Sequence, residues 1–128
     1  MTPTELSEIT GKIIEFSIKA HKALGPGMLE GAYEICLTHE LVKYGFSVER
    51  QKKLPIVYDG VRLDAGYRID LLVNNSIIVE VKAVERLHPV HEAQPLSYLR
   101  MTGIKLGLLI NFNMKMLKDG VKRVVNRL

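Results

Sequence analysis

The sequence contains a single cysteine, Cys36, among its 128 residues. One cysteine excludes an internal disulfide bond and a zinc site built from cysteine ligands. No apolar run is long enough to span a bilayer, and the first residues lack the basic and apolar segments of a signal peptide. These absences predict a cytoplasmic protein that has no membrane partner.

A phosphate-binding loop is also missing, because Gly25-Pro26-Gly27 follows a predicted helix rather than a strand. The length allows one domain with a hydrophobic core, and we expect residues 1–128 to form a single domain. Hydrophobic residues make up 47% of the chain and charged residues 25%, which is typical of a globular protein.

The first third of the chain predicts two helices. Thr2 and Glu5 form a capping box around Pro3, and an apolar stripe with three- and four-residue steps follows: Leu6, Ile9, Ile13, Phe16, Ala20 and Leu24. A second helix is expected over residues 28–43 and should end at Gly45. Its inner side should carry Leu29, Ala32, Cys36, Leu37 and Leu41.

The remaining chain predicts mainly strands. We expect strands over residues 46–53, 61–65, 68–73, 77–83, 105–112 and 121–125, and a helix over residues 89–102. Residues 54–58 could continue the first strand after Pro55, and Asp59-Gly60 is a hairpin turn. An antiparallel meander followed by one helical crossover predicts an α/β fold in which helices flank a mixed sheet.

Three charged side chains interrupt two otherwise apolar strands, namely Asp70 in residues 68–73, and Glu80 and Lys82 in residues 77–83. Burying such groups is costly unless they form ion pairs or bind a metal. They could form a structural ion-pair cluster, because such clusters also occur without function. The alternative is a functional site.

The register of these two strands depends on the turn between them. A two-residue Asn74-Asn75 turn places Asp70 opposite Val79, so Asp70 and Glu80 would point to opposite sides of the sheet. A three-residue loop over 74–76 places Asp70 opposite Glu80, with Cβ atoms about 4.5–5.5 Å apart. We expect the three-residue loop because it separates a polar face from an apolar one. The apolar face would contain Ile69, Leu71, Val73, Ile77, Val79 and Val81.

The net charge is +4, and the excess gathers near the C-terminus. From Lys115 onward the chain has five basic residues and one acid, Asp119. This segment could be a solvated surface, or it could bind a polyanion such as nucleic acid.

Several short motifs together resemble one family. Asp70 and Glu80-Val81-Lys82 match the signature of the PD-(D/E)XK nucleases, although Ile69 stands where that pattern often has proline. The wider sequence closely resembles the GxxExxY protein family, which is grouped with these nucleases. The resemblance covers about residues 13–125 and rests on Gly27-Met28-Leu29-Glu30-Gly31-Ala32-Tyr33, Gly66-Tyr67-Arg68-Ile69-Asp70, His91-Glu92-Ala93-Gln94, residues 108–113 and residues 118–123.

This resemblance implies a core of helix, three-stranded meander, helix and strand, preceded here by an extra helix. Asp70 and Glu80 would bind Mg²⁺ or Mn²⁺, with the Val81 carbonyl as a further ligand. Lys82 would position or activate water, or neutralise the phosphate in the transition state, and Glu30 would support the metal or Lys82.

The third expected helix adds Gln94 and Tyr98, which share a face because they are four residues apart. The pair resembles a motif that supports the site or the nucleic acid in exonuclease-type members, although Pro95 should kink or delay this helix. For nucleic-acid binding we expect Tyr98, Lys118, Lys122 and Arg123 to contribute. The resemblance thus implies a nuclease, and we expect DNA rather than RNA as its nucleic-acid partner. A non-catalytic nucleic-acid-binding or assembly module is the alternative, and a homo-oligomer is possible.

Overall fold

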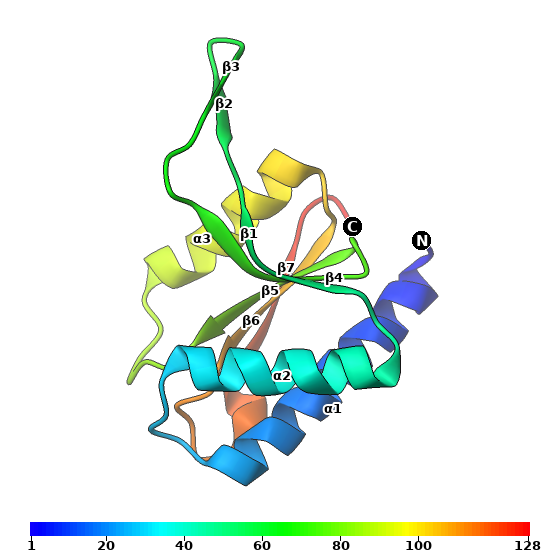
Figure 1. The fold of residues 1–128 in the computed structure, drawn as a ribbon, viewed down its shortest axis with the longest axis vertical. Coiled ribbons are helices and arrows are strands. Elements are labelled where there is room, and N and C mark those ends of the chain that lie inside the picture. Colours follow the sequence, from blue (N-terminus) through cyan, green and yellow to red (C-terminus); the bar gives the residue numbers. More distant parts are fainter.

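Five strands and three helices form a three-layer α/β fold in the computed structural model, which describes residues 1–128 (Figure 1). Helices α1 and α2 cover one face of the sheet, and α3 covers the other. The helices are α1 (Pro3–Leu24), α2 (Glu30–Tyr44) and α3 (Pro89–Thr102). In spatial order, the strands are β1 (Val48–Lys53), β4 (Arg68–Val73), β5 (Ile77–Lys82), β6 (Leu106–Asn111) and β7 (Val121–Val125).

The connectivity confirms the predicted fold class. Strands β1, β4 and β5 form an antiparallel meander, and α3 then crosses over to β6, which runs parallel to β5. Every residue of β6 is buried, as expected for a strand covered on both faces. None of the helices combines the length and apolar character needed to cross a membrane.

Two hydrophobic clusters lie on opposite sides of the sheet. The larger joins α1 and α2 to the sheet, and it includes Ile13, Tyr33, Leu37, Leu71 and Phe112. The smaller lies beneath α3 and contains Leu54, Ile69, Leu72, Ile78, Tyr98 and Leu99. The α1 capping box of Thr2 and Glu5 is present as predicted.

Helix α2 differs from its predicted inner side. Leu29 has an extended backbone before the helix and is 84% exposed, so it is not a core residue. Ala32 and Cys36 are only half-buried. The buried face is instead formed by Tyr33, Glu34, Leu37 and Leu41, because the helix is rotated so that the tyrosine ring stacks on Phe112, with centroids 4.6 Å apart.

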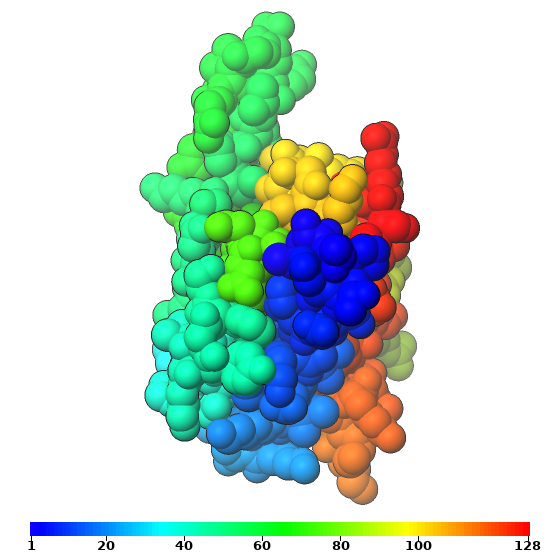
Figure 2. All heavy atoms as spheres, turned by 90° about the vertical axis from the view of Figure 1, so that its right-hand side faces the viewer, coloured from blue at the N-terminus to red at the C-terminus, as the bar shows by residue number.

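A hairpin arm projects from the sheet between β1 and β4. It consists of β2 (Ile56–Tyr58) and β3 (Val61–Leu63), which form their own two-stranded sheet, joined at the predicted Asp59-Gly60 turn. Strand β1 ends at Lys53, so residues 54–58 do not continue it as one unbroken strand. Figure 2 shows the arm standing clear of the helices. The arm therefore begins at β1 and ends at β4, which is the strand that carries Asp70.

The loop between β4 and β5 has the predicted length. Val73 pairs with Ile77 across Asn74, Asn75 and Ser76, and both asparagines adopt left-handed backbone conformations, with φ of 50° and 52°. Continuing this register places Asp70 opposite Glu80.

Candidate active site

The pairing of β4 and β5 changes at Asp70. Regular pairing extends from Val73–Ile77 to Leu71–Val79, and side chains then take over the hydrogen bonds between the strands. The Val81 N–H donates to Oδ2 of Asp70 at 2.8 Å, and the Asp70 N–H donates to Oε1 of Glu80 at 3.4 Å. Two carboxylates therefore occupy the gap between these strands.

Side-chain alternation along β4 is also broken at Asp70. Leu71 packs in the cluster beneath α1 and α2, whereas Ile69 packs in the cluster beneath α3. Residues two apart in a regular strand share a face. The predicted apolar face therefore holds for its other five members, but its assignment of Ile69 is wrong, because Ile69 packs on the α3 side of the sheet and Leu71 on the other.

Burial and charge strongly perturb Glu80, which is only 4% exposed. Burial raises its pKa to about 9, and the negative charge of Asp70 acts in the same direction. The positive charge of half-buried Lys82 partly opposes this rise in pKa. Without a bound cation, this raised pKa favours the protonated form of Glu80 at neutral pH.

The backbone of Val81 adds a further oxygen to this site. Within a strand, the N–H and C=O of one residue point toward the same neighbouring strand. Because the Val81 N–H reaches Asp70 on β4, its carbonyl also faces β4. The predicted ligands Asp70, Glu80 and Val81 thus meet in the gap between β4 and β5.

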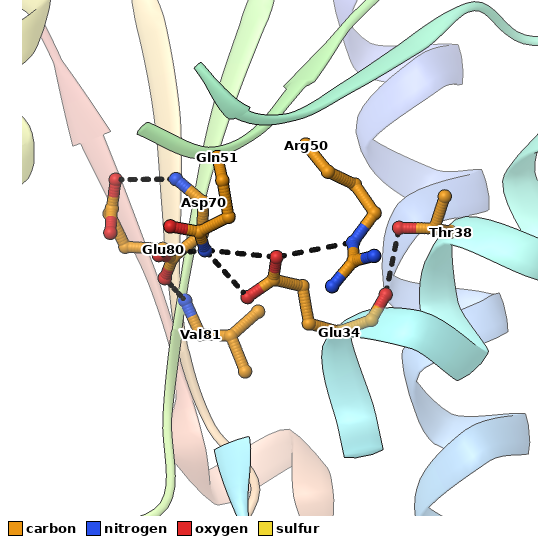
Figure 3. A network of polar contacts seen from close by, with 7 residues as sticks. All are labelled: Glu34, Thr38, Arg50, Gln51, Asp70, Glu80 and Val81. Carbon is orange, nitrogen blue, oxygen red and sulfur yellow. Dashed lines mark hydrogen bonds and ion pairs between the residues drawn. The ribbon is translucent and has the colours of Figure 1, made fainter. Parts of the chain in front are cut away.

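A partly exposed polar network links this gap to α2 (Figure 3). Nε2 of Gln51 donates to both carboxylate oxygens of Glu34, at 3.0 and 3.1 Å, and to Oδ1 of Asp70 at 3.2 Å. Nε of Arg50 approaches Glu34 at 3.3 Å. Gln51, whose φ of 51° is left-handed, therefore uses its amide to join two carboxylates from different elements.

The sequence analysis missed both Glu34 and Gln51. One signal for Glu34 was available, since it shares helical spacing with the core residues Leu37 and Leu41. A carboxylate on such a stripe needs a polar partner. No comparable signal identifies Gln51, because the other residues of β1 are also largely polar and exposed.

Glu30 lies one helical turn before Glu34. Its carboxylate accepts a hydrogen bond from the Ala83 N–H at 3.4 Å, immediately beyond Lys82. Glu30 therefore approaches the Lys82 end of β5, whereas Glu34 is the glutamate linked to Asp70.

Helix α3 places Tyr98 beside the carboxylates. Tyr98 is 6% exposed, and burial raises its pKa, with further increases from the negative charges of Glu80 and Asp70. Helix α3 begins at Pro89 and includes Pro95, so Pro95 does not delay its start, and Gln94 lies half-buried one turn before Tyr98. The Tyr98 ring thus belongs to the core, and its hydroxyl lies within the electrostatic influence of the two carboxylates.

The predicted basic residues lie across the sheet from this site. Lys118 is in the short 3-10 helix η1 (Leu117–Gly120), and Lys122 and Arg123 are in β7, two strands beyond β5. Lys122 forms an ion pair with Glu92 of α3. Its charge is therefore partly neutralised within the protein.

The donor atoms favour a hard cation. No group of three histidine, cysteine, aspartate or glutamate side chains is placed to hold a metal. Two carboxylates and a backbone carbonyl suit Mg²⁺ or Mn²⁺, which can complete their coordination with water and substrate oxygens. They do not suit a structural zinc ion, which takes four protein ligands, mostly sulfur or nitrogen.

Comparison with known families agrees with this arrangement. The model of the PD-(D/E)XK nuclease superfamily, whose nucleases typically use divalent metals, matches residues 7–124. No curated protein and no solved structure gives a match. The matched segment contains the site and almost the whole sheet, and the chain belongs to the PD-(D/E)XK nuclease superfamily.

Proposed function

We propose that this protein is a metal-dependent nuclease that hydrolyses phosphodiester bonds in nucleic acid, with DNA the favoured substrate. The observation that carries this proposal is the gap between β4 and β5, where Asp70 and Glu80 meet at the end of regular pairing. A carboxylate pair with a strongly raised Glu80 pKa, in a superfamily of nucleases, supports a catalytic role over a purely structural one.

Asp70, Glu80 and the Val81 carbonyl would hold Mg²⁺ or Mn²⁺. When bound, such a cation lowers the pKa of water and stabilises negative charge on the phosphate. Glu80 would release its proton when it becomes a ligand, because a metal-binding carboxylate must be ionised. Gln51 would keep Asp70 oriented through the hydrogen bond at 3.2 Å.

Lys82 lies two residues beyond Glu80, on the same face of β5. Its ammonium is a compact positive charge, suited to steady an attacking water or the charge that develops on the phosphate. Glu30 would restrict the position of the segment after Lys82 through its contact with Ala83. Gln94 and the Tyr98 hydroxyl would contact the substrate from α3.

Binding of the flanking phosphates would involve Lys118 and Arg123 more than Lys122. The ion pair with Glu92 already engages Lys122, so a phosphate would have to compete with that carboxylate. Each phosphate contact should add to the salt dependence of binding.

A direct assay tests the proposal. Wild-type protein is incubated with end-labelled single-stranded DNA, double-stranded DNA and RNA in Mg²⁺, Mn²⁺ or EDTA. We expect metal-dependent cleavage that Lys82→Ala abolishes while binding is largely retained, because a single lysine at the reacting centre acts mainly on the transition state. The neighbouring exposed Lys52→Ala is the matched control and should cleave normally.

Absence of cleavage on every substrate would reject the nuclease proposal. Retained binding in that case would identify a non-catalytic nucleic-acid-binding module. If binding were also absent, the fold would serve a protein partner instead.

A further inference from the structure

Tyr67 is an exposed tyrosine immediately before β4, and the proposed nuclease function gives it no role. It lies three residues before Asp70, so the two Cα atoms are separated by about 10 Å along the chain at the rise of a strand. Tyr67 is 43% exposed, whereas its neighbour Tyr98 is 6% exposed. An aromatic side chain is therefore open to solvent on the segment that leads into the Asp70 strand.

The position of Tyr67 is fixed by its surroundings. Its carbonyl accepts a hydrogen bond from the Leu54 N–H at 3.0 Å, at the base of the hairpin arm. The preceding turn is held by Asp64, which accepts from the Gly66 N–H at 2.9 Å, and Gly66 has a left-handed φ of 80°. The backbone therefore presents this ring from a defined place.

The two tyrosine rings make a supported aromatic pair. Their centroids are 6.1 Å apart, and their planes meet at 63°, which is an edge-to-face contact. Tyr98 is anchored in the cluster beneath α3, together with Leu72 and Leu99. Tyr98 holds the pair in place from within the core. The solvent-exposed surface of the pair belongs to Tyr67.

We propose that Tyr67 is a stacking platform for a nucleobase next to the cleaved bond, and that the protein acts on strands in which this base is unpaired. The inference rests on the proposed nuclease function and specifies its substrate class. Aromatic side chains stack on any base whose face is free. In an intact duplex those faces are covered, and exposing one requires unstacking. Single strands, frayed ends and gaps offer the face directly.

The experiment is a double-mutant cycle between the ring and the base. Binding is measured in the Lys82→Ala background, so that the strand stays intact, with fluorescein-labelled single-stranded oligonucleotides. One series carries a single abasic site, moved one position at a time past the bond that the wild type cleaves. We expect Tyr67→Ala to weaken binding of the normal strand by about 5- to 150-fold.

At one position of the oligonucleotide only, an abasic site should weaken binding by the same factor as Tyr67→Ala. At that position, Tyr67→Ala and the abasic site together should be no worse than either alone, because both remove one contact. Tyr67→Phe should bind like the parent protein. The affinity for a blunt-ended duplex should change less than twofold in Tyr67→Ala or Tyr67→Phe.

Two controls separate stacking from packing. Tyr67→Leu keeps an apolar cover over Tyr98 but should lose the base contact, so it should resemble Tyr67→Ala in binding and the parent in thermal unfolding. Tyr58→Ala removes a 71% exposed tyrosine near the tip of the arm and should leave binding unchanged. Additive effects of ring and base at every position, or equal losses with Tyr67→Ala and Tyr58→Ala, would overturn the stacking role.

A different result would reject the nuclease function rather than the stacking role. In that case the wild type would cleave no strand, and abasic sites would be scanned along the whole oligonucleotide. A coupled position found there would retain the stacking role in a binding protein. Cleavage of single strands without any coupled position would reject stacking and retain the nuclease.

Discussion

The two ends of the β4–β5 pair have opposite characters, although they belong to the same two strands. At one end, Leu71 and Val73 face Val79 and Ile77 in regular pairing, and all four side chains are 0% exposed. At the other end, carboxylate oxygens accept the hydrogen bonds that a backbone ladder would make. One end buries apolar side chains, and the other brings two carboxylates together.

The protein tolerates an electrostatically unfavourable carboxylate pair at the polar end of these strands. Burying Glu80 next to Asp70 raises the pKa of Glu80 to about 9, which means that the folded state disfavours its ionised form. The apolar end of the same strands offsets this disadvantage through burial. Substitutions at the two ends should therefore separate activity from stability.

The largest effect is expected from Asp70→Asn at the polar end. The asparagine keeps an oxygen that can accept from the Val81 N–H, but it loses the negative charge that would bind the cation. We expect cleavage to fall about 1,000-fold or more while the melting temperature stays the same or rises. Activity above a tenth of the wild-type value would contradict a metal-binding role for Asp70.

At the apolar end, Leu71→Ala should have the next largest effect, this time on stability. Leu71 is 0% exposed, and its truncation should lower the free energy of unfolding by about 2–5 kcal/mol. Cleavage per folded molecule should not change. Denaturant unfolding measures the loss, and Val57→Ala, at a site 68% exposed on the arm, is the control. A comparable loss of unfolding free energy in Val57→Ala would contradict a special role of the apolar end in stability.

The pH dependence of stability should reveal the proton on Glu80. The pKa of Glu80 rises from its ordinary value of 4.5 to about 9 on folding, so between these values the folded state holds a proton that the unfolded state has released. Metal-free protein should therefore lose stability as pH rises through this window, by up to about 1.4 kcal/mol per pH unit.

Glu80→Gln should remove this pH dependence, because glutamine carries no titrating proton. Thermal or denaturant unfolding in EDTA across the same pH window tests it. A Glu5→Gln variant, at an exposed position, serves as the control and should keep the wild-type slope. Identical slopes in wild type and Glu80→Gln would mean that Glu80 is already ionised.

A smaller effect on cation binding is expected at Gln51, which lies on β1 and donates a hydrogen bond to Asp70. Gln51→Met keeps the length of the side chain and removes the amide that joins Glu34 to Asp70. Groups that orient a metal ligand typically contribute 10- to 100-fold to affinity or activity, and we expect the lower end, about tenfold. Calorimetric titration with Mn²⁺ measures the change, and Lys52→Met is the neighbouring control.

Prediction from sequence succeeded where one physical constraint dominated. The register of β4 and β5 followed from the requirement to separate faces and from two asparagines that tolerate left-handed backbone. The polar network was less accessible, because it depends on the left-handed conformation of Gln51 and on the rotation of α2. The broken alternation at Ile69 was equally hidden, since its cause is the replacement of backbone pairing by side chains.

The raised pKa of Glu80 would couple cation binding to proton release. Between neutral pH and about pH 9, occupation of Glu80 by a cation would expel a proton into the buffer. The affinity for the cation should therefore grow stronger as the solution becomes more alkaline. The heat measured on binding should also vary with the ionisation enthalpy of the buffer, and that variation would count the protons released per cation bound.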